Sequence, residues 1–402
     1  MKYVPIPIAM LEIGRPLPVD VWSPAGQLLL RKGQPVQSAQ HKERLHAHNA
    51  GSTPNDAWAW QRAYERMVHT MMRDGVDLQT IANAPMPSEI LQRDYVAAEE
   101  LNGGWLDLQE VLRGILYQGG LAISPLRRLA GIEKKALELL RLDTDDSLFC
   151  LFQALTDNTL GYCATHALLC AVVCELTAKK LGLDPLLRRA LFNAALTMNI
   201  GMAREQDSLA RQSTAVTEWQ RTLIREHPVR SMEILSAIGI SDPDQLDIVR
   251  WHHAAESEEA APHTLTARRI IGMTDGFVAK MAARKTRSSL SPVSAVKSMV
   301  LGVQGPTVGV GSAMAQAVGF YPPGSYVQLA NGDTAVAVQR GERANTPWVV
   351  SVVDKDGMPV SNYMAKDTAN PANAILAPVN FEKVRVAISL DKVRKARDRI
   401  RR

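Results

Sequence analysis

The chain has 402 residues, of which 46% are hydrophobic, 22% charged and 5% aromatic. This apolar fraction is large enough to bury more than one core, which excludes a generally disordered chain. Four cysteines are too few for a disulfide scaffold, so we expect reduced thiols in a cytoplasmic protein. The sequence shows neither a signal peptide nor an apolar run of bilayer length, so we expect no membrane span.

The formal net charge of +5 is concentrated at the C-terminal end. Seven basic and two acidic residues between Ser389 and Arg402 give this segment a net charge of +5, equal to that of the whole chain. The remainder carries no net charge, which argues against nucleic-acid binding by the body. Val393, Ala396 and Ile400 form a weak apolar stripe on the tail. We therefore expect a solvent-exposed basic helix, with contact to anionic lipid, nucleic acid or an acidic partner as the alternative.

The residue patterns predict a mainly α protein with small β-rich segments towards both ends. Short apolar runs around turn residues indicate strands, and apolar periods near 3.6 indicate helices. Asn331-Gly332 between two alternating runs is the strongest hairpin signal. The predicted segments are a β-rich segment over 1–50, a helical region over 51–142, a helical domain over 143–302, a β-rich extension over 303–387 and a basic helix over 388–402.

The helical domain has the clearest start and stop signals. Helices are expected over about 157–180, 185–199, 217–235, 244–253 and 265–284. An acidic, alanine-rich loop over 254–263 separates the last two. The glycine-rich stretch over 302–311 lacks the strand-to-helix context of a phosphate-binding loop, so we expect a flexible connection there.

Histidines from separate predicted helices suggest a metal site. Imidazoles and a carboxylate that converge from several helices are the usual way in which a bundle binds a metal ion. The adjacent His252 and His253 would point about 100° apart on a helix, so both could be ligands only with two metals, or with a metal and a phosphate. The candidates are His166, His227, His252, His253 and, less clearly, His263, together with Asp275.

Three cysteines share one helical face with His166. Cys163, Cys170 and Cys174 stand at positions that invite a zinc interpretation. Eleven residues of helix span roughly 16 Å, which is too far for all four side chains to reach one ion. We therefore expect these cysteines to be buried core thiols.

The order and spacing of these segments resemble the HD-GYP domain, the bacterial phosphodiesterase branch of the HD metal-phosphohydrolase superfamily. The likeness covers about residues 157–300, and the flanking β-rich segments resemble those that accompany such domains. It implies an HD-superfamily helical bundle at the centre of the chain. The segments that carry it are Tyr162–His166, Met198–Met202, Arg225–Pro228, Ile248–His253, Ile270–Phe277 and Arg284–Pro292.

In that family, histidines and aspartates hold two or three metal ions, and a bridging hydroxide attacks cyclic di-GMP. The resemblance assigns Arg284 and Arg287 as phosphate contacts, because a guanidinium group can donate two parallel hydrogen bonds to a phosphate. It assigns the role of metal ligand to His166, His227, His252, His253 and Asp275.

The catalytic residues of the family are missing. Met198 and Asn199 replace the histidine and aspartate of the namesake pair, Met202 replaces a lysine, and no Gly-Tyr-Pro follows His253. A neutral amide and a thioether are poor ligands for iron or manganese. The resemblance thus implies a catalytically impaired domain whose surviving ligands could hold one divalent ion, iron or manganese, with no other cofactor.

The resemblance and the basic tail together leave several functions open. The first is bacterial signalling, either as a cyclic-dinucleotide sensor or as a protein-interaction module with a partner in the pathway. An active metal-dependent phosphodiesterase with an altered ligand set is the alternative. A nucleic-acid-binding adaptor that uses the tail is the least favoured, and exposed helical flanks are compatible with a homodimer.

Overall fold

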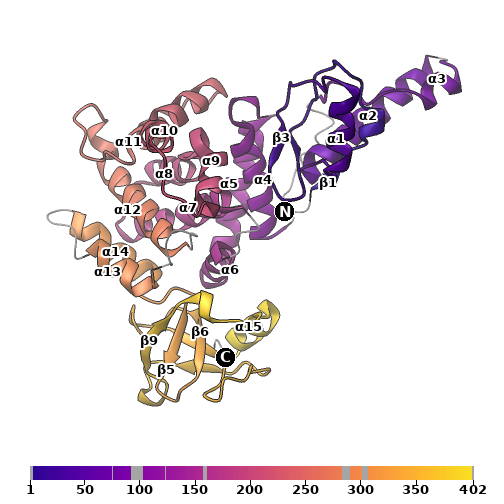
Figure 1. Ribbon diagram of the computed structural model, residues 1–402. Coiled ribbons are helices and arrows are strands. Elements are labelled where there is room, and N and C mark those ends of the chain that lie inside the picture. Colours follow the sequence, from indigo (N-terminus) through magenta and orange to yellow (C-terminus); the bar gives the residue numbers. More distant parts are fainter. Residues whose placement is uncertain are drawn as a thin grey trace. The chain divides into compact units, whose positions relative to one another are not determined.

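The computed structural model describes residues 3–74, 76–91, 103–122, 124–156, 161–282, 290–300 and 307–400 (Figure 1). It divides into two compact units, Met1–Glu100 and Leu101–Arg402. The chain is mainly α-helical with small antiparallel sheets towards both ends, which confirms the predicted fold class. Within the described residues, no helix is both long enough and apolar enough to cross a lipid bilayer.

The first unit combines a small antiparallel sheet with helices. Its strands lie in the order β1-β4-β2-β3, with bounds β1 (Val4–Pro5), β2 (Val21–Trp22), β3 (Leu28–Leu30) and β4 (Gly51–Ser52). Its helices are α1 (Ala39–Ala47), α2 (Pro54–Arg73) and α3 (Leu78–Ala82), with a 3-10 turn η1 at Ile8–Met10. The predicted β-rich segment 1–50 therefore also contains a helix, α1, which begins where the Ser38 hydroxyl accepts a hydrogen bond from the His41 N–H at 3.1 Å.

The second unit is built around one buried helix. Helix α7 (Tyr162–Lys180) is buried continuously from Tyr162 to Cys174 and packs against α6, α8, α12 and α14. The helices of this unit are α4 (Trp105–Gln118), α5 (Pro125–Leu142), α6 (Thr144–Thr156), α7, α8 (Pro185–Thr197), α9 (Ala203–Arg211), α10 (Glu218–Ala237), α11 (Pro243–Trp251), α12 (Leu265–Met281), α13 (Pro292–Val300) and α14 (Thr307–Val318), with 3-10 turns η2 (Gly119–Leu121), η3 (Ile200–Met202) and η4 (Pro262–Thr264). A helix buried on every side explains why its sequence shows no polar face.

Local capping chemistry sets several of these helix ends. At the start of α10 the Thr217 hydroxyl accepts from the Gln220 N–H at 3.3 Å, and the Gln220 side chain accepts from the Thr217 N–H at 2.9 Å. Helix α8 begins at Pro185, with Asp184 as its cap. Both starts lie where the sequence predicts them.

The prediction of a flexible connection over 302–311 was wrong for residues 307–311, while residues 302–306 lie outside the described residues. Gly309 and Gly311 lie inside α14, and Val310 and Met314 join the core around α7. Small residues allow this helix to lie close to α7, so packing outweighs the low helix propensity of glycine. The segment predicted as a β-rich extension thus contributes its first helix to the helical body.

A five-stranded antiparallel sheet follows, in the order β8-β7-β6-β5-β9. Tyr326 pairs with Val336 across the predicted hairpin, and Gly332 in its turn has a φ of 90°, which glycine adopts without strain. The strands are β5 (Tyr326–Leu329), β6 (Thr334–Gln339), β7 (Trp348–Val353), β8 (Ala365–Asp367) and β9 (Ile375–Val379), with 3-10 turns η5 (Pro371–Asn373) and η6 (Phe381–Lys383).

The basic tail forms a helix, α15 (Leu390–Asp398), as predicted, but it is exposed on only part of its surface because one face is buried against the chain. Val393 and Ala396 are buried in the apolar cluster beneath the sheet. Arg397 is 2% exposed, and its guanidinium group lies 2.5 Å from Asp143 and 3.4 Å from Asp146. Two of the basic residues of the tail, Arg394 and Arg397, therefore bind acidic residues at the start of α6 within the same chain.

Candidate metal centre

Four helices supply the predicted ligands. Helix α7 carries His166, α10 carries His227, and α12 carries Asp275, while His252 and His253 directly follow α11. Helix α12 packs against both α7 and α11, and α10 packs against α11. Five of the predicted ligands, together with Cys170, form two groups that could each hold a cation: His227, His252 and His253 (the imidazole group), and His166, Cys170 and Asp275 (the mixed group).

In the imidazole group, the rings of His227 and His252 face each other with their Nε2 atoms. The Nε2 atoms of His227 and His252 are 3.1 Å apart. Their Nδ1 atoms lie 2.6 Å from the Ile224 carbonyl and 2.7 Å from the Val249 carbonyl. Since a carbonyl can only accept, Nδ1 carries the proton in each ring and Nε2 carries a lone pair. Two lone pairs at this distance repel each other unless a cation or a proton lies between them.

The sequence around each ring explains why these carbonyls are available. Pro228 lies within α10 and has no N–H, so it cannot bond the carbonyl of Ile224 four residues earlier. That oxygen is the one that accepts from His227. Val249 lies in the last turn of α11, where carbonyls lack a full set of helical donors.

His253 completes the imidazole group, and the structure corrects the expectation for this adjacent pair. Because α11 ends at Trp251, His252 is its C-terminal cap and His253 lies in the following turn. The ligand atoms of His227, His252 and His253 lie within 4.8 Å of one another, so all three can reach one ion.

Burial keeps the imidazoles of His227 and His252 neutral. Desolvation lowers the pKa of His227 to about 4 and that of His252 to about 3. A neutral imidazole is the form that binds a metal ion. His227 and His252 are therefore ready to act as ligands at neutral pH.

The mixed group is satisfied by its own hydrogen bonds. His166 Nε2 lies 2.8 Å from a carboxylate oxygen of Asp275 and 3.4 Å from the Cys170 sulfur, and His166 Nδ1 lies 3.0 Å from the Tyr162 hydroxyl. Burial acts to raise the pKa of Asp275, but the hydrogen bond with His166 and the nearby imidazoles outweigh it and lower the pKa. The charge of Asp275 also acts on His227 and His252, which links the two groups electrostatically.

Two glycines allow close contact with the backbone of the imidazole ligands. A Cβ atom at Gly272 would lie 2.5 Å from the His252 carbonyl oxygen, and one at Gly201 would lie 3.0 Å from that of His227. Gly201 also donates its N–H to the Ser231 hydroxyl at 3.0 Å. These contacts fix α12 and η3 against the residues that carry the imidazoles.

Met198, Asn199 and Met202, which the resemblance aligns with the family's catalytic positions, are all buried. Met198 belongs to the apolar core and Met202 is also buried, so neither offers a charged group. Asn199 is 2% exposed, and neither polar atom of its amide has a hydrogen-bond partner among the described residues. A buried amide without partners costs free energy, which suits a position that faces a polar ligand.

The loop between α11 and α12 is held by ion pairs. Arg269 donates two hydrogen bonds to Glu256, at 2.7 and 2.9 Å, and Asp247 accepts from the Ala261 N–H at 3.0 Å. His263 pairs with Asp244 at 2.7 Å and belongs to neither ligand group. The predicted phosphate contacts Arg284 and Arg287 lie outside the described residues.

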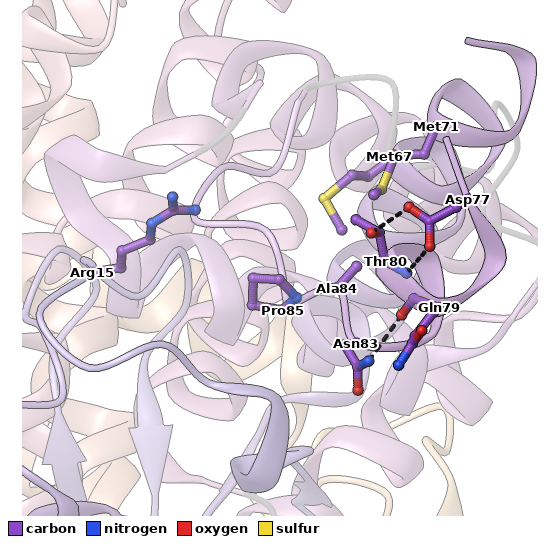
Figure 2. A pocket seen from close by; sticks show the side chains of 9 residues that line it. All are labelled: Arg15, Met67, Met71, Asp77, Gln79, Thr80, Asn83, Ala84 and Pro85. Carbon is purple, nitrogen blue, oxygen red and sulfur yellow. Dashed lines mark hydrogen bonds between the residues drawn. The ribbon is translucent and has the colours of Figure 1, made fainter. Parts of the chain in front are cut away.

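The first unit contains a pocket of about 530 Å³, shown in Figure 2. Its polar groups are already used locally: Asp77 accepts from Thr80 at 2.9 and 2.6 Å, and the Asn83 amide donates to the Gln79 carbonyl at 2.9 Å. Arg15 pairs with Glu12 at 2.9 Å. These contacts leave the pocket without the converging ligand atoms of the second unit. The lining residues are Arg15, Met67, Met71, Asp77, Gln79, Thr80, Asn83, Ala84 and Pro85.

No protein-family model and no curated protein sequence matches this chain. Among solved structures, the chain is similar to the HDG"Y"P protein Bd1817 from Bdellovibrio bacteriovorus, with a TM-score of 0.41 and 14% sequence identity. The match covers 78% of this chain and 98% of that protein.

Proposed function

We propose that the second unit is an HD-GYP-like domain that binds a divalent metal ion, has lost hydrolysis, and acts in bacterial signalling by binding a cyclic dinucleotide. The observation that carries the metal site is the 3.1 Å approach of the His227 and His252 Nε2 atoms, each ring being held by a backbone carbonyl. His253 is the third ligand. Two further ligand residues, His166 and Asp275, lie within electrostatic reach of these imidazoles.

Impaired hydrolysis follows from the groups at the replaced positions. Asn199 is neutral, so it cannot offset the repulsion between two cations as a bridging carboxylate does. Met198 lies in the apolar core, and Met202 brings no positive charge to a scissile phosphate. A bound divalent ion would supply positive charge for the anionic oxygens of a phosphodiester. In this proposal the chain keeps the side chains that bind the metal ion. At positions 198, 199 and 202 it lacks the side chains that the family uses for hydrolysis.

Metal analysis and nucleotide binding test this function together. We expect the purified protein to retain a divalent ion through gel filtration, and to bind cyclic di-GMP by calorimetry without converting it to the linear dinucleotide. His252→Ala should remove the ion, and metal affinity should fall by at least about 100-fold, because even the loss of a second-sphere partner costs 10–100-fold. His263→Ala, an exposed histidine in neither group, is the matched control and should bind like the wild type.

Two outcomes would overturn parts of the proposal. Turnover of cyclic di-GMP with stoichiometric iron or manganese, lost in His252→Ala, would establish an active phosphodiesterase with an altered ligand set. Retention of metal without nucleotide binding would leave the role of a protein-interaction module.

A further inference from the structure

The mixed group brings a cysteine to a position where the sequence predicted an inert core thiol. The Cys170 sulfur lies 3.4 Å from His166 Nε2, and the ligand atoms of His166, Cys170 and Asp275 all lie within 4.8 Å of one another. Cys170 and His166 are one helical turn apart on α7, so their side chains share a face. Asp275 reaches the same point from α12.

The arrangement is not a nucleophile, base and acid relay. In such a relay the cysteine and the carboxylate contact opposite nitrogens of the imidazole. Here Cys170 and Asp275 both contact Nε2, while Nδ1 faces the Tyr162 hydroxyl. Three potential ligand atoms that converge on one point, with an outer partner behind the ring, match the pattern of a cation site.

The distances suit a small tetrahedral ion. With Zn–S near 2.3 Å and Zn–N near 2.0–2.1 Å, neighbouring ligand atoms of a tetrahedral zinc lie about 3.3–3.6 Å apart. The sulfur-to-nitrogen distance of 3.4 Å already falls in this range, and the nitrogen-to-oxygen distance of 2.8 Å needs to open by only about 0.5 Å.

We propose that Cys170 is a metal ligand and that His166, Cys170 and Asp275 form a zinc-selective site. This proposal rests on the metal centre proposed above and changes the metal expected at one of its two groups. A thiolate is a soft ligand that favours zinc over the harder manganese ion. On binding, the Cys170 thiol releases its proton to solvent, and the His166 proton moves from Nε2 to Nδ1, where it can be donated to the Tyr162 oxygen.

Cobalt(II) absorption of the full-length protein tests the proposal without an activity assay. Protein stripped with a chelator is titrated with cobalt(II), and a thiolate ligand gives a near-ultraviolet charge-transfer band. We expect this band in the wild type and in Cys174→Ser but not in Cys170→Ser. Cys174 is the matched control, since it is a fully buried cysteine one turn further along α7 and belongs to neither group. Zinc affinity at this site should fall at least tenfold in Cys170→Ser, with manganese affinity little changed.

Further results separate this proposal from the one before it. If the band persists in His252→Ala, the mixed group binds independently of the imidazole group, and the proposal holds. A band that survives in Cys170→Ser overturns it. Cobalt that binds without the band, and is lost in His252→Ala, overturns the cysteine ligand but leaves the imidazole group intact. Absence of any bound cobalt overturns both.

Discussion

The imidazole group and the mixed group differ in whether their ligand atoms are already hydrogen-bonded to one another. In the imidazole group two lone pairs face each other, and no acid separates them. In the mixed group the carboxylate of Asp275 already holds His166 by a hydrogen bond. The first group therefore gains most from a cation, whereas the second must first give up an internal hydrogen bond. We expect the imidazole group to bind first and more tightly.

Lowering the pH of the metal-free protein should have the largest effect. The pKa of His227 is about 4 and that of His252 about 3 in the folded chain, against about 6.5 when unfolded. The unfolded chain therefore binds protons that the folded chain does not, so stability falls as the pH drops below 6.5. The slope is about 1.4 kcal/mol per pH unit for each histidine, or about 4 kcal/mol between pH 6.5 and 4.5 after allowance for incomplete titration.

Urea unfolding in the presence of a chelator measures this dependence. The double variant His227→Gln, His252→Gln should have a much flatter profile across the same range. An equal slope in the wild type and the double variant would show that these imidazoles do not set the acid sensitivity.

A carboxylate at position 199 should show whether this residue faces the metal groups. Asn199→Asp places a charge in a buried site without hydrogen-bond partners, which should cost about 3 kcal/mol of stability in the metal-free protein at pH 7. Added metal should recover most of this loss if position 199 faces the ions. Thermal unfolding with and without zinc or manganese measures the difference, with Asn193→Asp on α8 as the control. A loss that metal does not recover would place Asn199 away from both groups.

Removal of one hydroxyl should weaken only the mixed group. In Tyr162→Phe the Nδ1 atom of His166 loses its partner at 3.0 Å, and loss of such a partner costs about 10-fold in metal affinity. Zinc competition with a chromophoric chelator measures the change. An equal loss of metal affinity at both groups would instead indicate that the substitution displaces α7 as a whole.

Replacement of a proline should have the smallest effect, and it acts on the imidazole group. In Pro228→Ala the new N–H competes with His227 for the Ile224 carbonyl, so metal affinity should fall by about 10-fold or less. Stability of the metal-free protein should not decrease, because proline is unfavourable inside a helix. Chemical unfolding and metal titration on the same sample separate the two quantities. A parallel loss of both would point to general unfolding of α10.

Local rules account for the parts of the fold that the sequence predicted. The Thr217 cap, the Pro185 start and the Asn331-Gly332 hairpin depend on neighbouring residues, and each lies where it was expected. Five of the six residues in the two groups, all but Cys170, are residues that the sequence order suggested as ligands, and their role as ligands stays a prediction.

The features that the sequence did not predict depend on tertiary contacts. Cys170 was set aside because four side chains on one stripe cannot reach one ion, although His166 and Cys170, four residues apart, needed only Asp275 from α12. Helix α14 depends on packing against α7, which outweighs the preferences of its glycines. The docking of α15 joins Arg397 to Asp143 across 254 residues of sequence, and no local pattern contains that pair.

The docked α15 has a practical consequence for solubility. Truncation before Ser389 looks harmless in the sequence, because it removes a charged tail. It would remove Arg397 and Arg394, which pair with Asp143 and Asp146, and uncover the apolar cluster that contains Phe149. It would also remove all of the net charge of +5, leaving a shortened protein that is isoelectric near neutral pH. Such a protein should precipitate more readily than the full chain, even if the metal centre remains folded.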